Sequence, residues 1–219
     1  MKNGSKMLPP RFHLKFHLSC YALTVEPGTA LQKMITQHKK EDVDAEKQAR
    51  HFLQLMDWLQ QAGYEHYEIS NFAKPGFKSQ HNSSYWAGKK YLGLGPSAHS
   101  FDGNSRQWNI ANNALYIQSL AQDKIPFEEE TLTTTQRLNE YIMTSLRTQE
   151  GLNLQHIENV FGEIVSQQLH KNSYKFITGE KLLLNGSLLQ LTKEGKLFAD
   201  GIAADLFFLE EKKTSTNKD

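Results

Sequence analysis

In the first half of the chain, the order of apolar and polar residues predicts two strands that flank a helix. Residues 18–25 are predicted as a strand that ends at the turn Glu26-Pro27-Gly28. Apolar residues at helical spacing predict an amphipathic helix over residues 43–62, and residues 64–70 are predicted as the next strand. This order predicts a parallel strand pair with a crossover helix, which is the unit of an α/β sheet or barrel.

The middle of the chain has a weaker pattern. Residues 71–90 are predicted as a long loop rich in glycine, serine and aromatic residues, and a loop of this length inside a domain is usually functional or disordered. Strand-like segments follow at 91–101 and 106–110, and then a helix at 112–122. We expect a domain boundary near residues 123–130, where a proline and an acidic run interrupt the pattern.

Beyond this boundary the pattern becomes mostly helical. The sequence Thr133-x-x-Gln136 resembles a capping box at the start of one helix. Asn185-Gly186, between two leucine-rich stretches, is typical of a tight hairpin. Further helices are predicted at about 153–160, 163–172 and 192–208. Helices followed by a hairpin and a helix indicate a small winged-helix-like domain.

Composition and charge narrow the class of protein. Apolar residues make up 38% and charged residues 22% of the 219 positions, which fits a globular protein. The formal net charge of +1 gives no global field that would favour nucleic acid or an anionic membrane. We find no membrane-spanning stretch and no secretory signal, so we expect a cytoplasmic protein. Cys20 is the only cysteine, which excludes an internal disulfide.

The sequence His81-Asn82-x-x-Tyr85-Trp86 is the sharpest motif of the predicted loop. Imidazole is a natural ligand of haem iron, and aromatic side chains pack on a porphyrin face. The motif therefore indicates a haem site in which His81 is the metal ligand and Asn82 orients its ring or binds a propionate. The alternative is a loop in which His81 and Asn82 only satisfy backbone groups.

His99 and a pair of glycines give further signals. His99 is a candidate second ligand or proton-transfer group, and the alternative is a histidine hydrogen-bonded inside a barrel mouth. Gly93-x-Gly95 mimics a dinucleotide fingerprint, but a poor helix start follows it. We interpret these glycines as places where the backbone passes close to another part of the fold.

Two carboxylates lie near the ends of predicted strands. In barrel folds such strand ends face the active site, so Glu26 and Glu68 are candidates for holding a polar cofactor group. For Glu26, beside a Pro-Gly turn, we prefer an ordinary solvated carboxylate. We predict no catalytic residue.

The run Tyr67-Glu68-Ile69-Ser70-Asn71-Phe72-Ala73, followed by the His81 motif, resembles the second half of the HemW-type proteins. These are radical-SAM relatives of oxygen-independent coproporphyrinogen III oxidase. The resemblance extends from about residue 17 to about residue 208. It implies that His81, Asn82, Tyr85 and Trp86 are haem-associated, and that the protein binds haem or porphyrin and delivers haem to acceptor proteins.

The chain also departs from this family. Family members begin with barrel strands whose CxxxCxxC motif holds a [4Fe–4S] cluster with S-adenosylmethionine. A cluster of this kind needs several thiolates, and Cys20 alone cannot supply them. We therefore expect a truncated HemW-like protein without its own cluster, which self-associates or needs a missing N-terminal half. The origin of the truncation stays open.

The combined expectation is an α/β fold, in which the C-terminal strands and helices of a partial radical-SAM, TIM-like barrel precede a mostly helical, winged-helix-like C-terminal domain. The predicted parts are an irregular segment (1–16), the half barrel (17–125), the helical domain (131–209) and a polar tail (210–219).

Two alternative functions stay open. One is a fragment of an oxygen-independent coproporphyrinogen III oxidase of porphyrin biosynthesis. The other is a winged-helix nucleic-acid-binding module. Seven Lys+Arg minus eight Asp+Glu between residues 133 and 209 give a net charge of −1, which argues against nucleic acid.

Overall fold

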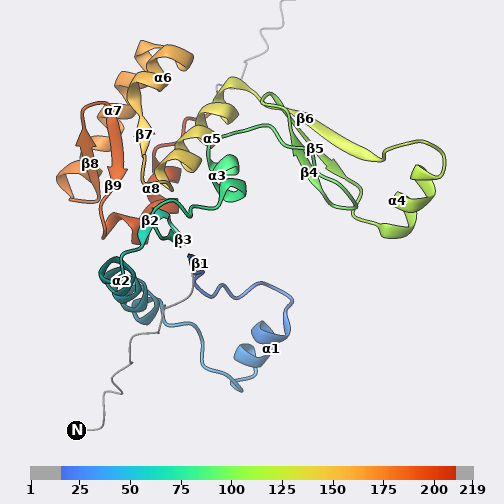
Figure 1. Ribbon diagram of the computed structural model, residues 1–219, viewed down its shortest axis with the longest axis horizontal. Coiled ribbons are helices and arrows are strands. Elements are labelled where there is room, and N and C mark those ends of the chain that lie inside the picture. Colours follow the sequence, from blue (N-terminus) through green and yellow to red (C-terminus); the bar gives the residue numbers. More distant parts are fainter. Residues whose placement is uncertain (1–15, 211–219) are drawn as a thin grey trace, which may run out of the picture.

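The computed structural model describes residues 16–210. They form a mixed α/β fold with three antiparallel sheets of three strands each, accompanied by helices (Figure 1). Most of the predicted segment 1–16 and of the predicted tail 210–219 lies outside the described residues.

The first two sheets occupy the first part of the chain. Their elements are β1 (His17–Ser19), α1 (Ala30–Thr36), α2 (Ala45–Gln61), β2 (Glu65–Glu68), β3 (Asn71–Ala73), α3 (Gln80–Trp86), β4 (His99–Phe101), β5 (Ser105–Asn109), α4 (Asn113–Leu120) and β6 (Phe127–Thr131).

The third sheet lies among the helices of the second part. Its elements are α5 (Thr134–Leu146), β7 (Leu152–Asn153), α6 (Leu154–Phe161), α7 (Glu163–Thr178), β8 (Leu182–Asn185), β9 (Leu188–Leu191), the 3₁₀ helix η1 (Gly195–Phe198) and α8 (Ala199–Asp205).

The first sheet has the strand order β1-β3-β2, and both of its pairs are antiparallel. Because each is antiparallel to β3, β1 and β2 run in the same direction, as predicted. They do not pair directly, however, since the chain turns back after β2 and inserts β3 between them, so the predicted parallel pairing is wrong. The strand predicted over 18–25 is also shorter than expected and ends at Ser19. The helix predicted over 43–62 is confirmed as α2, which packs Met56 and Leu59 against Phe72 of β3.

The second sheet, β4-β5-β6, and α4 form an arm that extends away from the rest of the molecule (Figure 1). The helix predicted over 112–122 is confirmed as α4, and Asn112 caps its start. The segment 123–130, where we expect a domain boundary, overlaps β6, whose five residues pair with β5. All five are exposed, and charged side chains are common on such edge strands because they discourage pairing with other chains.

The predicted loop over 71–90 is not a single loop, because it contains β3 and the short helix α3. A helix of seven residues gives too few repeats for its period to be recognised in a sequence. Its start is nevertheless locally encoded, since the hydroxyl of Ser79 accepts a hydrogen bond from the backbone N–H of Asn82.

The second part of the chain has its own apolar core, which includes Ile142, Leu146, Leu169 and Leu189. The capping box at Thr133 is confirmed, and so is the hairpin of β8 and β9. The helix predicted to end at residue 172 continues to Thr178. The last predicted helix begins as η1 and ends earlier than expected, at the end of α8.

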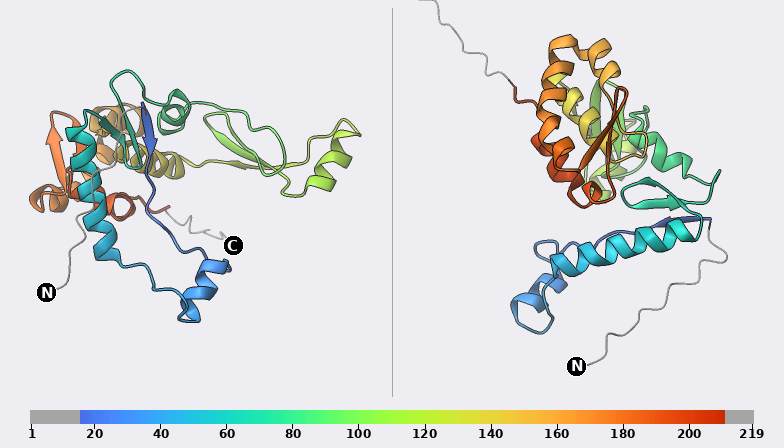
Figure 2. Two further views of the ribbon diagram at one scale, coloured as in Figure 1. Left: turned by 60° about the horizontal axis from the view of Figure 1, so that its bottom comes forward. Right: turned by 90° about the vertical axis from the view of Figure 1, so that its left-hand side faces the viewer.

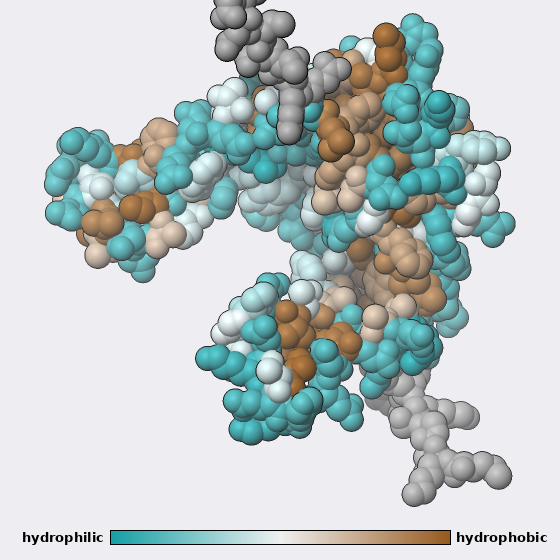
Figure 3. Space-filling model, turned by 180° about the vertical axis from the view of Figure 1, so that it is seen from behind, coloured by the Kyte–Doolittle hydropathy of each residue, from teal (hydrophilic) through white to brown (hydrophobic). Residues whose placement is uncertain are grey.

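The helix α2 lies against one side of the first sheet, and the C-terminal part of the chain lies on the other side (Figure 2). Residues 20–23, α1 and the start of α2 surround an open groove of about 860 Å³. Apolar side chains gather in this lobe of the molecule (Figure 3). Within residues 16–210, every helix is too short or too polar to cross a membrane.

Candidate functional site

The helix α3 carries all four residues of the His81 motif and presents them on two sides. Residues four positions apart lie one above the other on a helix. Asn82 and Trp86 therefore share one side, and His81 and Tyr85 share the neighbouring one. The structure gives these two pairs different surroundings.

The first pair faces the protein. The side-chain amide of Asn82 lies 3.5 Å from Oδ1 of Asn71 on β3. The ring of Trp86 lies 5.0 Å from the guanidinium carbon of Arg147, within the range of a cation–π contact. Asn82 also hydrogen-bonds Tyr67, whose hydroxyl lies 2.7 Å from Nε2 of His17. Burial raises the pKa of the Tyr67 hydroxyl. Asn82 and Trp86 thus attach α3 to the rest of the fold.

The second pair faces solvent. His81 is exposed, and 42% of Tyr85 is exposed, although their rings meet edge to face at 4.9 Å. Tyr85 contacts Tyr91 at 4.8 Å, and Tyr91 lies 6.1 Å from Phe101 of β4. These four rings, His81, Tyr85, Tyr91 and Phe101, form a continuous aromatic row from α3 to the arm.

His99 lies at the start of β4, two residues before Phe101, so both side chains point to the same face of this strand. It is exposed, and its ring lies 6.3 Å from Trp108 on β5. Among the described residues no hydrogen bond or ring contact joins His99 to His81. The two predicted ligand candidates thus lie at neighbouring but separate places.

Of the two glycines, only Gly93 lies at a close backbone approach, as the sequence suggested; a Cβ atom on Gly95 would meet nothing within 4 Å, and that position has a positive φ of 99° instead. A Cβ atom on Gly93 would lie 2.1 Å from the carbonyl oxygen of His99, so only glycine allows this approach. The backbone N–H of Gly93 donates to Ser100 Oγ at 3.0 Å. The segment after Gly95 leads into β4 rather than into a long helix, which a dinucleotide-binding turn requires.

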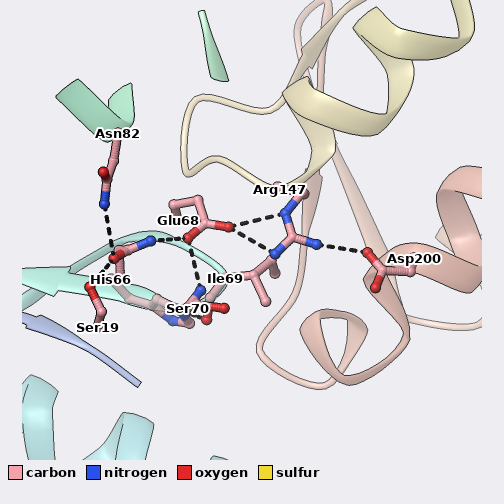
Figure 4. A network of polar contacts seen from close by, with 9 residues as sticks. Ser19, His66, Glu68, Ile69, Ser70, Asn82, Arg147 and Asp200 are labelled. Atoms are coloured by element: carbon pink, nitrogen blue, oxygen red, sulfur yellow. Dashed lines mark hydrogen bonds and ion pairs between the residues drawn. The ribbon is translucent and has the colours of Figure 1, made fainter. Parts of the chain in front are cut away.

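Glu68 is the centre of a buried polar network (Figure 4). Only 1% of its surface is exposed. One carboxylate oxygen accepts a hydrogen bond from Nε of Arg147 and forms an ion pair with Nη2, both at 3.0 Å. The other accepts from the backbone N–H of Ser70 and from the side-chain amide of Asn71. Glu68 is therefore bound to other protein groups, which contradicts a role in holding a cofactor group.

Glu26 has a different environment. It is exposed, and its backbone carbonyl accepts hydrogen bonds from the backbone and the hydroxyl of Thr29 in the turn before α1. The expected solvated carboxylate is confirmed for this residue.

Sequence reasoning missed several residues of the site. Arg147 is 79 positions from Glu68, and its Nη1 donates to Asp200 at 2.8 Å, so no local pattern signals either contact. Tyr91 and Phe101 lie in a segment predicted as a strand, and their contact depends on an isolated bridge between them. Among residues 16–210, no group of three or more His, Cys, Asp and Glu residues could hold a metal ion. A metal at His81 would therefore have to bring further ligands of its own, as a porphyrin does.

Comparison with known proteins connects this site to a family. Residues 132–198 match the family model of the HemN C-terminal domain. The chain is 29% identical over 188 residues to the heme chaperone HemW of Bacillus subtilis, covering 85% of this chain and 49% of the relative. It is 30% identical over 191 residues to HemW of Mycobacterium tuberculosis, covering 87% and 47%. The chain thus spans about half the length of the curated relatives it matches.

A solved structure gives the same result at the level of the fold. The coproporphyrinogen III oxidase HemN from Escherichia coli, described as a radical SAM enzyme, matches with a TM-score of 0.59 at 18% identity. The match covers 78% of this chain and 44% of HemN.

The fold and these matches define the class: the chain corresponds to the C-terminal portion of the proteins related to radical SAM coproporphyrinogen III oxidase. Within this class it belongs with the HemW-like proteins, whose named members at about 30% identity are heme chaperones.

Proposed function

We propose that this chain binds haem on the aromatic row, with His81 as the axial ligand of the iron. The observation that carries this proposal is the division of the motif between two sides of α3. Asn82 and Trp86 fasten the helix, which leaves the imidazole of His81 exposed beside the ring of Tyr85. An exposed imidazole next to aromatic rings offers both an iron ligand and an apolar contact for a porphyrin.

Charge near the row supports the same ligand. Lys89 and Lys90 are exposed and lie between Tyr85 and Tyr91, two members of the row. Haem carries two propionate groups, and ammonium groups at this place would pair with them. His99, on the same strand β4 as Phe101 of the row, is the second candidate ligand.

We infer that haem held in this way is cargo that passes to acceptor proteins, as the name of the relatives suggests. The end of the row formed by His81 and Tyr85 is exposed to solvent, which suits transfer better than permanent retention. We also propose that this chain by itself carries neither a [4Fe–4S] cluster nor S-adenosylmethionine, because its 219 residues contain one cysteine. The partial barrel, the winged-helix-like domain and a cytoplasmic location belong to the same proposal.

A spectroscopic titration tests the function. Haemin is added to the wild-type chain and to the variants His81→Ala, His99→Ala and His170→Ala, and binding is followed at the Soret band. His170 is an exposed histidine of α7, outside the row, and provides the matched control. We expect the largest loss of affinity and a changed Soret position in His81→Ala, a smaller loss of affinity in His99→Ala, and no change in His170→Ala.

Iron-free protoporphyrin separates the two parts of the site. His81→Ala should weaken its binding much less than that of haemin, because protoporphyrin has no iron for the imidazole and loses only the contact with one ring of the row. Replacing Tyr85 with alanine should weaken the binding of both haemin and protoporphyrin. Equal haemin affinity in wild type and His81→Ala would remove His81 as the ligand, and no binding to wild type would contradict the proposed function.

A further inference from the structure

Arg147, from the C-terminal part of the chain, is connected to α3 in two ways. It contacts Trp86 directly, and it reaches Asn82 through Glu68 and Asn71. Arg147 follows α5, and 19% of its side chain is exposed. All three of its guanidinium nitrogens contact carboxylates: Nε donates to Glu68, Nη2 forms an ion pair with the same oxygen, and Nη1 donates to Asp200. Its backbone carbonyl accepts from Ile69 at 3.0 Å. These contacts hold the guanidinium plane in a fixed orientation.

The direct route runs from the face of this plane to α3. With the edges of the guanidinium occupied by carboxylates, its face is free to meet the ring of Trp86, at 5.0 Å. A guanidinium held in this way stacks on an aromatic ring better than a mobile one, and lysine cannot reproduce its planar fork.

The indirect route runs through hydrogen bonds. Arg147 binds one oxygen of Glu68, the other oxygen accepts from the amide of Asn71, and Oδ1 of Asn71 lies 3.5 Å from the amide of Asn82 (Figure 4). Ser19 of β1 also donates to Asn71 Oδ1 at 2.6 Å, which fixes the orientation of that amide. Trp86 and Asn82 are the residues of α3 that contact this network, so Arg147 acts on both.

We propose that Arg147 is a positioning residue, which sets the place of α3 and so the direction in which His81 and Tyr85 present their rings. The C-terminal domain would then control the ligand site through this side chain. This inference rests on the proposed function only for its consequence for haem. Its structural part, the fastening of α3 by Arg147, can be measured without any ligand.

Hydrogen exchange followed by mass spectrometry tests the structural part. The variant Arg147→Lys keeps a positive charge but loses the planar fork, and Trp86→Leu removes the ring while leaving the pair of Arg147 with Glu68 intact. In both variants we expect the amides of α3 to exchange about tenfold faster, the size of effect that a lost cation–π contact gives. The amides of α2 and α7 should exchange as in wild type.

The matched control is Arg106→Lys. Arg106 on β5 pairs with Glu140 on α5 at 2.8 Å, so it also joins the arm to the C-terminal part, but it contacts no residue of α3 among those described. Exchange in α3 should stay at its wild-type rate in this variant. If Arg147→Lys does not fold, Trp86→Leu still carries the test, since its ring is partly exposed.

Haemin titration of the same variants measures how the position of α3 affects the affinity for haem. We expect about tenfold weaker binding in Arg147→Lys and Trp86→Leu, with the Soret position of a His81 complex retained at saturation. Unchanged exchange of α3 in both variants would overturn the positioning role, even if haem binds through His81. Faster exchange combined with no haem binding to wild type would instead uphold the positioning role and contradict the proposed function.

Discussion

The Nζ atom of Lys196 lies 2.9 Å from Nδ1 of His66, although 130 residues separate them in the sequence. Nε2 of His66 lies 2.9 Å from the carbonyl oxygen of Ile69, so Nε2 carries the proton and Nδ1 accepts from the lysine. The imidazole also stacks on Phe72 at 4.0 Å. This contact joins the first sheet to the C-terminal part, and it exists only while His66 is neutral.

We predict from this contact that the protein loses stability in acid. Burial, and then the charge of Lys196, lower the pKa of His66 from 6.5 to about 4. As the pH falls, His66 therefore becomes protonated near pH 6.5 in the unfolded chain but only near pH 4 in the folded chain. Stability should fall between these values, by up to about 3 kcal/mol, since one pKa unit corresponds to about 1.4 kcal/mol.

At alkaline pH we expect the protein to gain stability, because of Lys196. Burial lowers the pKa of Lys196 from 10.5 to about 8, so the folded state disfavours the charged amine and gains stability as pH rises between these values. Urea unfolding across the pH range, together with an NMR titration of His66, measures both effects. A midpoint for His66 near its ordinary value of 6.5 would contradict the buried contact.

The second prediction concerns Glu68. Replacing it with alanine leaves Nε and Nη2 of Arg147 and the amide of the buried Asn71 without their acceptor, although Nη1 of Arg147 keeps Asp200. Breaking a buried pair of this kind costs about 3–5 kcal/mol. Glu65→Ala on the same strand is the control, because its pair with Lys78 is partly exposed and should contribute less than about 1 kcal/mol. Denaturant unfolding gives both values, and equal losses would mean that the network contributes little.

The third prediction concerns the close approach at Gly93. Gly93→Ala would place a Cβ atom 2.1 Å from the backbone oxygen of His99, so β4 must move, and we expect a loss of about 1–3 kcal/mol. Gly201→Ala in α8 meets nothing within 4 Å, and alanine there should stabilise the helix by about 1 kcal/mol. Thermal melting compares the two, and a neutral Gly93→Ala would show that the strand yields without cost.

The fourth prediction concerns self-association. Tyr21 and Leu23 are 73% and 58% exposed where the chain continues from the edge strand β1 beside the open groove. Exposed apolar side chains next to an unpaired strand edge favour association with another chain. We expect the chain to self-associate and Leu23→Lys to shift it toward monomer. Ile164→Lys, at an 82% exposed position on α7, should leave the distribution unchanged. Light scattering after size exclusion decides between these outcomes.

The sequence by itself determined the features that depend on neighbours a few residues apart. The period of apolar residues predicted α2, and the hydroxyl of Thr133 with the amide of Gln136 marked the start of α5. Asn185-Gly186 marked the hairpin. Each of these depends on contacts within one turn of helix or one tight loop, so a short stretch of sequence contains the whole cause.

Only the tertiary structure decided how the motif around His81 divides. The sequence grouped His81, Asn82, Tyr85 and Trp86 as one ligand set, because it could not show what each side of α3 meets. Trp86 contacts Arg147, which is 61 positions further along the chain (147 minus 86). Arg147 is in turn bound by Glu68, which precedes Trp86 in the sequence. Such contacts depend on how distant elements pack, and β3, inserted between β1 and β2, places Asn71 beside this network.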